Sequence, residues 1–211
     1  RPRDSLAGFS RPSLTVRKPS ATDSNSAPSL ETPDLRVVLA AGVAGTPRLI
    51  WQAPTTGHVY MADRGTSAYL ASKRTGAIRH CVVRDPADRY FGLGDKSGPL
   101  NLHGRRLRCM GQDSLGYNPQ SGDPLYKHWP FLMQRTPQGL WLGIYYDTLS
   151  ACTFDLGCEH DNYHDFFRTI EIDDGDLDYY IMVGDSPASV LHQFMSLIGG
   201  THLPPKWSVG F

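Results

Sequence analysis

The sequence lacks several features that would assign it to a functional class at once. It has no net charge, since 21 Lys and Arg residues balance 21 Asp and Glu residues. Bulk charge therefore gives no reason to expect a polyanionic partner. No apolar run approaches the roughly 20 residues that a membrane span requires, and no secretory signal is visible. We expect neither a nucleic acid nor a membrane as partner.

The cysteines are few, and their spacing is not that of a metal or redox motif. Cys81, Cys109, Cys152 and Cys158 form no CxxC pair, the spacing of many zinc sites and of thioredoxin-like centres. They lie in apolar, strand-like contexts, where a thiol behaves as a small hydrophobic group. We therefore expect a reducing compartment, the cytoplasm. The sequence begins with Arg1 rather than methionine, which leaves a removed leader open.

The charges are unevenly distributed along the chain. Residues 73–108 contain nine basic and three acidic side chains, whereas residues 155–185 contain ten acidic and one basic. A basic run can indicate a nucleic-acid interface, but no recognisable nucleic-acid-binding motif surrounds this one. We interpret the two runs as solvated strand faces of opposite charge.

Two candidate ligand motifs are weak. His160 and His164, with acidic neighbours, could hold a metal ion if their side chains converged, but the loop or strand expected here does not require it. Gly92-Leu93-Gly94 has the start of a dinucleotide-binding loop, yet Ser97 stands where glycine is needed and no βαβ unit surrounds it. We predict no metal and no cofactor.

Composition divides the chain into three parts. Residues 1–33 are rich in Ser, Pro, Thr and Arg and nearly free of aromatics, so we predict a disordered or loosely ordered segment. Residues 34–185 alternate short apolar runs with turn signals, which is typical of an all-β sandwich or barrel; we predict a large antiparallel β-sandwich. The expected strands are 35–40, 47–52, 59–61, 67–71, 77–83, 105–110, 129–134, 140–146, 152–156, 166–172 and 177–183.

The expected strand 140–146 is apolar on both faces, because Leu142 and Ile144 alternate with Trp141 and Tyr145. Such a strand is expected at the centre of a sheet that is covered on both sides.

The third part, residues 186–211, begins with a predicted helix over 187–198. Ser186 can cap it, Pro187 suits its first position, and Gly199 can end it. A new apolar strand is predicted over 203–211. The expected apolar stripe of the helix comprises Pro187, Leu191, Phe194 and Ile198, with Val190 and Leu197 beside it.

The long polar loop between the strands at 105–110 and 129–134 carries Asp113 and Tyr117. A loop of this length inside a compact domain usually has a function. Motifs on both sides of it, with others near the end of the chain, occur in a fixed order. They are residues 90–95 (YFGLGD), 98–102 (GPLNL), 111–113 (GQD), 123–131 (DPLYKHWPF), 177–184 (LDYYIMVG) and 203–207 (LPPKW).

In this order the motifs resemble the N-terminal β-sandwich of glycoside hydrolase family 31, the α-glucosidase family. The sequence departs from the family pattern at Asp95, where Glu is commoner, and at Trp129, where Ile is usual. The resemblance implies a galactose mutarotase-like sandwich that precedes a catalytic (β/α)8 barrel. Family members are retaining enzymes that use two carboxylates, and both are aspartates of the barrel. We therefore predict no catalytic residue in this chain.

The resemblance also implies a role for the long loop, which in the family reaches over the barrel mouth. The matching residue is Asp113, whose carboxylate could accept two hydrogen bonds from sugar hydroxyls, and Tyr117 could add a stacking or hydroxyl contact. The predicted partners are the barrel and an oligosaccharide or α-glycoside substrate of the parent enzyme. The structural alternative for Asp113 is a turn residue that caps its own backbone.

Two other functions stay open. A stand-alone carbohydrate-binding module would need exposed aromatics on one sheet face, among Trp51, Tyr60, Trp141 and Tyr145. A purely structural sandwich would bind nothing. The LPPKW segment favours the enzyme domain, because a stand-alone module has no need of a strand that leads into a barrel.

Overall fold

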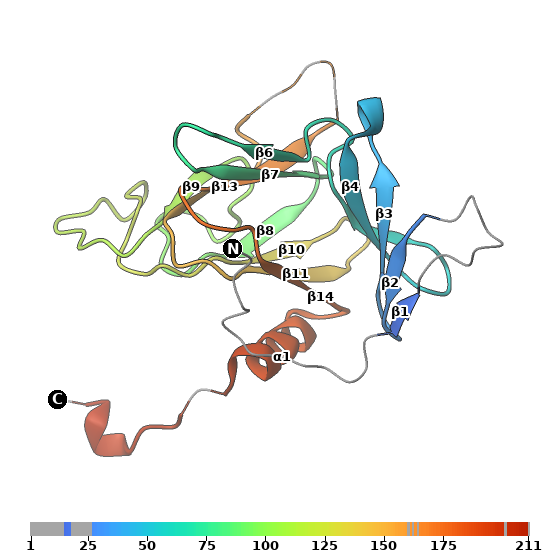
Figure 1. Cartoon of the computed structure of the whole chain (residues 1–211). Coiled ribbons are helices and arrows are strands. Elements are labelled where there is room, and N and C mark those ends of the chain that lie inside the picture. Colours follow the sequence, from blue (N-terminus) through green and yellow to red (C-terminus); the bar gives the residue numbers. More distant parts are fainter. Residues whose placement is uncertain are drawn as a thin grey trace.

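The computed structural model describes residues 15–17, 27–159, 161, 163, 165–200 and 202–210. In these residues the chain folds into three antiparallel sheets and one α-helix (Figure 1). Two sheets form the predicted β-sandwich. The helix-side sheet has the order β14-β11-β10-β8 and consists of β8 (Arg89–Gly92), β10 (Phe131–Arg135), β11 (Trp141–Tyr146) and β14 (Tyr179–Gly184).

The outer sheet of the sandwich has the order β6-β7-β13-β12-β9. Its inward side chains, such as Val82, Phe154 and Ile170, meet Tyr90, Leu132 and others from the helix-side sheet in one buried core. The strands are β6 (Tyr69–Ala71), β7 (Ile78–Val83), β9 (Arg106–Cys109), β12 (Cys152–Asp155) and β13 (Phe167–Ile172).

The N-terminal sheet lies at one end of the sandwich (Figure 1) and has the order β1-β2-β3-β4-β5. Strand β2 pairs with β3 although it lies within the segment that composition predicts to be poorly ordered. The backbone hydrogen bonds to β3 hold this segment in an extended conformation, although its side chains bury little apolar surface. The elements are β1 (Thr15–Arg17), β2 (Ser29–Glu31), β3 (Arg36–Ala41), the 3-10 turn η1 (Val43–Gly45), β4 (Pro47–Gln52) and β5 (Val59–Ala62).

A buried carboxylate joins all three sheets. Asp63 follows β5, and both Asp63 and His80 of β7 have no exposed surface. Asp63 Oδ1 lies 2.8 Å from His80 Nε2, and Oδ2 accepts hydrogen bonds from the Leu49 N–H of β4 and the Tyr69 hydroxyl of β6. A carboxylate only accepts, so Nε2 carries the proton and Nδ1 accepts from the Tyr146 hydroxyl of β11, 3.1 Å away.

The two charged runs meet on the outer sheet. Arg106 pairs with Asp155 at 2.7 Å, and Arg79 pairs with Glu171 at 2.8 Å. Hydrogen bonds from Arg108 hold the pKa of Asp173 below its ordinary value. Strand pairing therefore brings the basic run beside the acidic run.

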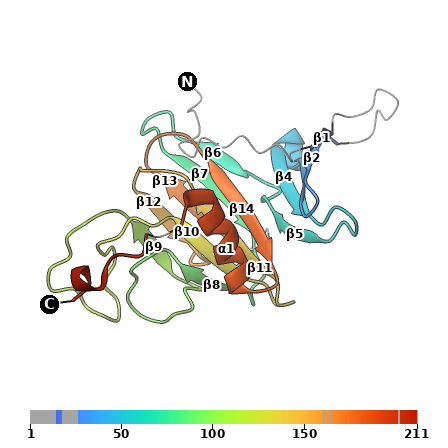
Figure 2. The same cartoon turned by 90° about the horizontal axis from the view of Figure 1, so that it is seen from below.

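Helix α1 (Pro187–Ile198) covers the other face of the helix-side sheet (Figure 2). Its ends are as predicted: the Ser186 hydroxyl accepts from the Ser189 N–H, and Gly199 follows the last turn with φ +93°. Val190, Phe194 and Leu197 are its buried residues, and Phe194 stacks on Phe131 at 4.0 Å. As predicted, β11 is central and covered on both sides. No helix in the described ranges has the length and apolar character that a membrane crossing requires.

Two expectations about residues 186–211 are wrong. Leu191 and Ile198 are exposed rather than buried, because the helix turns its Val190–Leu197 side toward the sheet. The predicted strand over 203–211 is absent from the described residues 202–210, where the 3-10 turn η2 (Lys206–Ser208) forms instead. A strand requires a hydrogen-bonded neighbour, and none of the described strands pairs with this segment.

Packing of the helix depends on the missing side chain of Gly143 in β11. A Cβ there would lie 2.5 Å from Val190 Cγ1 and 3.1 Å from Phe131 Cε2. We expect Gly143→Ala to lower the free energy of unfolding by about 1–3 kcal/mol through overpacking, although alanine otherwise favours strands over glycine by about 0.5–1 kcal/mol. Urea unfolding measures this. Gly200→Ala is the control, because a Cβ there would meet nothing within 4 Å. Equal urea midpoints for the Gly143→Ala and Gly200→Ala proteins would disprove the close packing at Gly143.

The buried histidine predicts a pH dependence of stability. Burial lowers the pKa of His80 below its ordinary value of 6.5, against the raising effect of Asp63. The unfolded chain therefore takes up a proton near pH 6.5 that the folded protein does not bind. Stability is complete above this pH, and we expect it to fall by up to ~1.4 kcal/mol per pH unit below it.

Urea unfolding between about pH 8 and pH 5 tests this expectation, with His80→Gln as the variant and the exposed His192→Gln as the control. The His80→Gln protein should lose most of this slope, whatever its absolute stability. If the pH slope survives in the His80→Gln protein but disappears in the His192→Gln protein, then His192 rather than His80 causes the pH dependence, and the prediction is wrong.

Candidate functional site

The candidate site is the loop of residues 111–127, which runs from β9 to β10 and is called the long loop below. Figures 1 and 2 show it in yellow-green, extending from one end of the sandwich, and the C-terminal segment extends in the same direction. Gly, Pro, Asn and Ser are frequent in it, which explains why it forms no regular element.

A buried ion pair fixes the base of the long loop. The side chain of Lys96 is only 3% exposed; its Nζ lies 2.9 Å from Asp123 Oδ1 and also donates to the Arg108 carbonyl oxygen. Asp123 Oδ2 accepts from the Arg108 N–H of β9, and the Ser97 hydroxyl donates to the Gly122 carbonyl oxygen at 2.6 Å. Charge-assisted hydrogen bonds of this kind are among the stronger ones in proteins.

Glycines let neighbouring segments approach the base. Gly92 has φ +98°, and a Cβ there would lie 2.5 Å from the Phe131 carbonyl oxygen. Gly98 has φ +82° and would place a Cβ 2.8 Å from the Gln120 carbonyl oxygen. Only glycine satisfies both the positive φ and the contact, which gives the YFGLG and GPLNL motifs a structural reason.

The long loop carries both predicted residues. Asp113 is exposed, and its carboxylate makes no hydrogen bond within the described part of the chain, so no backbone cap is found there. Tyr117 is 48% exposed and lies edge-on to Tyr126 at 6.4 Å. The Tyr126 hydroxyl donates to the Ser114 carbonyl oxygen at 3.0 Å. Tyr117 therefore contributes to loop packing, whereas the Asp113 carboxylate is available to a ligand.

Other candidate groups are not brought together. His160 and His164 lie outside the described residues. In the ranges that are described, no group of three His, Cys, Asp or Glu side chains could hold a metal ion. Their neighbours Glu159 and Asp161 pair with arginines instead.

Three of the four aromatics expected on an exposed platform are packed instead, and the fourth, Tyr60, is partly buried. Trp51 is 3% exposed in the core, and Trp141 and Tyr145 pack against the cluster under α1. Burying these rings stabilises the fold more than leaving them exposed to solvent on a sheet face would.

Sequence reasoning missed Lys96 and Asp123 as the residues that position the site. Lys96 follows the motif at 90–95 and Asp123 begins the motif at 123–131, but the two residues are 27 positions apart. No spacing rule pairs such residues before the strands that carry them are known.

Two lysines near the long loop provide a matched test of its anchoring. Lys96→Met leaves Asp123 partly buried without its cation, and we expect it to cost about 3–5 kcal/mol of unfolding free energy. Lys127→Met removes the exposed pair with Asp95 and should cost about 1 kcal/mol or less. Urea unfolding gives both values, and equal small losses would show that the buried pair does not hold the loop.

The comparisons with known proteins agree with this architecture. The family model of the glycosyl hydrolase 31 N-terminal galactose mutarotase-like domain matches residues 12–155. Alpha-glucosidase 2 of Bacillus thermoamyloliquefaciens is 34% identical over 143 residues, 67% of this chain and 17% of that protein. Alpha-xylosidase XylQ of Lactiplantibacillus pentosus is 27% identical over 123 residues, 58% of this chain and 15% of that protein.

Solved structures give the same result. A glycoside hydrolase 31 dextranase of Flavobacterium johnsoniae, complexed with isomaltotriose, superposes with a TM-score of 0.76 at 27% identity, over 94% of this chain and 22% of that chain. The chain thus spans less than a quarter of each of these relatives. The match to the family model covers more than half of the chain, and the chain belongs to the family of glycosyl hydrolase 31 N-terminal galactose mutarotase-like domains.

Proposed function

We propose that the chain is the N-terminal domain of a longer retaining α-glycosidase, in which it supports the catalytic barrel and contributes the long loop to the substrate-binding rim. The observation that carries this proposal is the contrast within that loop. Its base is fixed by the buried Lys96–Asp123 pair, whereas the Asp113 carboxylate is exposed and unbonded in the described structure. An acceptor held in place in this way loses little conformational entropy when it binds a sugar hydroxyl.

The named relatives support the substrate class. The α-glucosidase and α-xylosidase are named for α-glycosides, and the dextranase structure holds isomaltotriose. We infer an oligosaccharide or α-glycoside substrate for the parent protein, with both catalytic carboxylates outside this chain. The four unpaired cysteines are consistent with a reducing compartment, and on that ground we infer a cytoplasmic location.

An apolar surface at the same end of the sandwich suits the barrel. Trp129 and Leu149 are 45% and 75% exposed, and they flank the hydrogen bond from the His128 imidazole Nε2–H to the Thr148 carbonyl oxygen at 2.8 Å. Ile198 lies one helical turn beyond Phe194, which packs on Phe131 beside them. Clustered exposed apolar side chains mark interaction surfaces. We interpret residues 186–211 as the connection that leads into the barrel.

Asp113→Ala in the full-length parent protein tests the role of the long loop. Removing a charged acceptor of sugar hydroxyl hydrogen bonds costs about 1.5–3 kcal/mol. We therefore expect kcat/KM for an oligosaccharide to fall by roughly 10- to 100-fold. Tyr117→Phe should have a smaller effect.

Asp176→Ala is the matched control, because Asp176 is an exposed carboxylate on the turn between β13 and β14. An equal kcat/KM for the Asp113→Ala and Asp176→Ala proteins would remove the long loop from the substrate site. Turnover of an α-glucoside by the 211-residue chain alone would contradict the assignment of catalysis to the barrel.

A further inference from the structure

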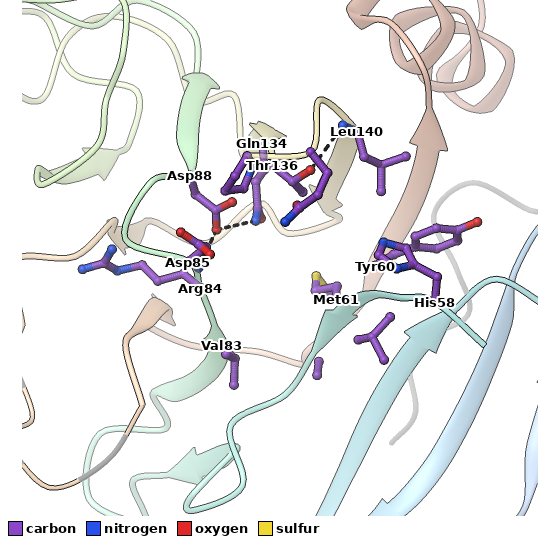
Figure 3. A pocket seen from close by; sticks show the side chains of 14 residues that line it. His58, Tyr60, Met61, Val83, Arg84, Asp85, Asp88, Gln134, Thr136 and Leu140 are labelled. Carbon is purple, nitrogen blue, oxygen red and sulfur yellow. Dashed lines mark hydrogen bonds between the residues drawn. The ribbon is translucent and has the colours of Figure 1, made fainter. Parts of the chain in front are cut away.

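A second candidate site lies at the opposite end of β10 from the long loop. The loop joins β10 before Phe131, and the strand ends at Arg135, next to the hairpin turn that leads to β11. There a pocket of about 300 Å³ opens between this turn, β5 and the segment that follows β7. Figure 3 shows Asp88 and Gln134 on one side of the pocket and His58, Tyr60 and Met61 on the other.

The polar side of the pocket contains an acceptor without a donor. The Gln134 side chain is buried, with 4% of the residue exposed, and its Nε2 donates to Asp88 Oδ2 at 2.8 Å. Its Oε1 is buried and has no hydrogen-bond partner among the described residues. The amide cannot be turned to satisfy this atom, because Oε1 would then face the Asp88 carboxylate, which only accepts. A buried acceptor left unpaired costs about 1–3 kcal/mol. A ligand hydroxyl that reaches Oε1, which itself has almost no accessible surface, recovers this energy.

Asp88 adds a second acceptor on the same side. Its Oδ2 accepts from Gln134, from the Asp85 N–H at 2.9 Å and from the Tyr90 hydroxyl at 3.3 Å. Its Oδ1 makes no hydrogen bond in the part of the chain that the structure describes. Burial raises the pKa of Asp88, and the hydrogen bonds from the Asp85 N–H and Gln134 oppose this effect more than the charge of Arg168 does.

These charges select a neutral ligand. The pocket is lined by charges of both signs, with Arg84 beside Asp85 and Asp88. Neither an anion nor a cation therefore gains a large advantage there. Hydroxyl groups meet the need of the pocket for donors. The opposite wall offers Met61 and the ring of Tyr60 to apolar C–H groups, and Leu140 of the hairpin adds a third apolar side chain. A volume of about 300 Å³ is at the lower end of the range for ligand sites and suits one sugar ring rather than a chain.

We propose that this pocket binds a single neutral glycosyl unit, with Gln134 Oε1 and Asp88 Oδ1 as acceptors of its hydroxyl hydrogen bonds, at a site separate from the long loop. The choice of a glycosyl unit among neutral polyols rests on the proposed function, whereas the position of the pocket and its need for donors do not. Such a site would hold a branch or a distant unit of an oligosaccharide on the sandwich.

The test is a titration of the ¹⁵N-labelled 211-residue chain with glucose, maltose and isomaltose, followed by amide chemical shifts. We expect saturating shifts in residues 58–62 and 134–140, with dissociation constants in the millimolar range. Gln134→Met removes the acceptor at similar volume and should weaken binding at least about tenfold. Gln120→Met, on the exposed long loop, is the matched control and should bind as the unchanged chain does.

Each outcome is decisive. Shifts confined to residues 111–127 would overturn the proposed binding in the pocket but support the role of Asp113. If none of the three sugars causes shifts, the proposed binding in the pocket is wrong, whereas the kinetic test of Asp113 is unaffected. Equal saturation of the pocket by inorganic phosphate would overturn the neutral-ligand assignment. If Gln134→Met does not fold, His58→Ala at the exposed rim replaces it, and undiminished sugar binding by that variant would count against the site.

Discussion

The carboxylate of Asp63 is the constraint on which the arrangement of the three sheets depends. It has no exposed surface, and its hydrogen bonds come from His80, Leu49 and Tyr69. Through His80 it reaches Tyr146 of the helix-side sheet. A buried charge is tolerated only when its acceptor positions are filled. Any shift of the N-terminal sheet relative to the outer sheet would leave this charge short of a donor, so the N-terminal sheet and the sandwich keep one relative position. That position places β5 opposite Gln134 and thereby forms the pocket.

Surface charge is organised by the same strand order. The basic run and the acidic run are far apart in sequence, but β9 pairs with β12 and β7 pairs with β13. Arg106 thus meets Asp155, and Arg79 meets Glu171. Together with Lys96 and Arg108, which pair with Asp123 and Asp173, four of the nine basic residues of the run are occupied by carboxylates.

Features set by local chemistry could be predicted from the sequence, and features set by distant partners could not. The ends of α1 follow from Ser186, Pro187 and Gly199, which act within a few residues, and β4 has the predicted bounds because turn signals flank it. The buried side of α1 was misjudged, since it depends on where Gly143 leaves room for Val190. Asp113 was identified through a family motif, whereas the Lys96–Asp123 anchor and the Gln134–Asp88 hydrogen bond depend on contacts over 27 and 46 residues.

The two proposed contacts with substrate lie at opposite ends of β10. At the Phe131 end, a buried ion pair holds a loop whose acceptor is exposed, and the apolar side chains Trp129 and Leu149 lie beside it. At the Arg135 end, a short hairpin closes over acceptors that are buried. Strand β10 is rigidly paired on both sides, with β8 and β11. The separation of the two ends is therefore fixed by the strand rather than by either loop. An oligosaccharide long enough to reach both ends could bind at one end first. Binding at the other end would then be an intramolecular step, which raises the overall affinity without any new contact at the rim.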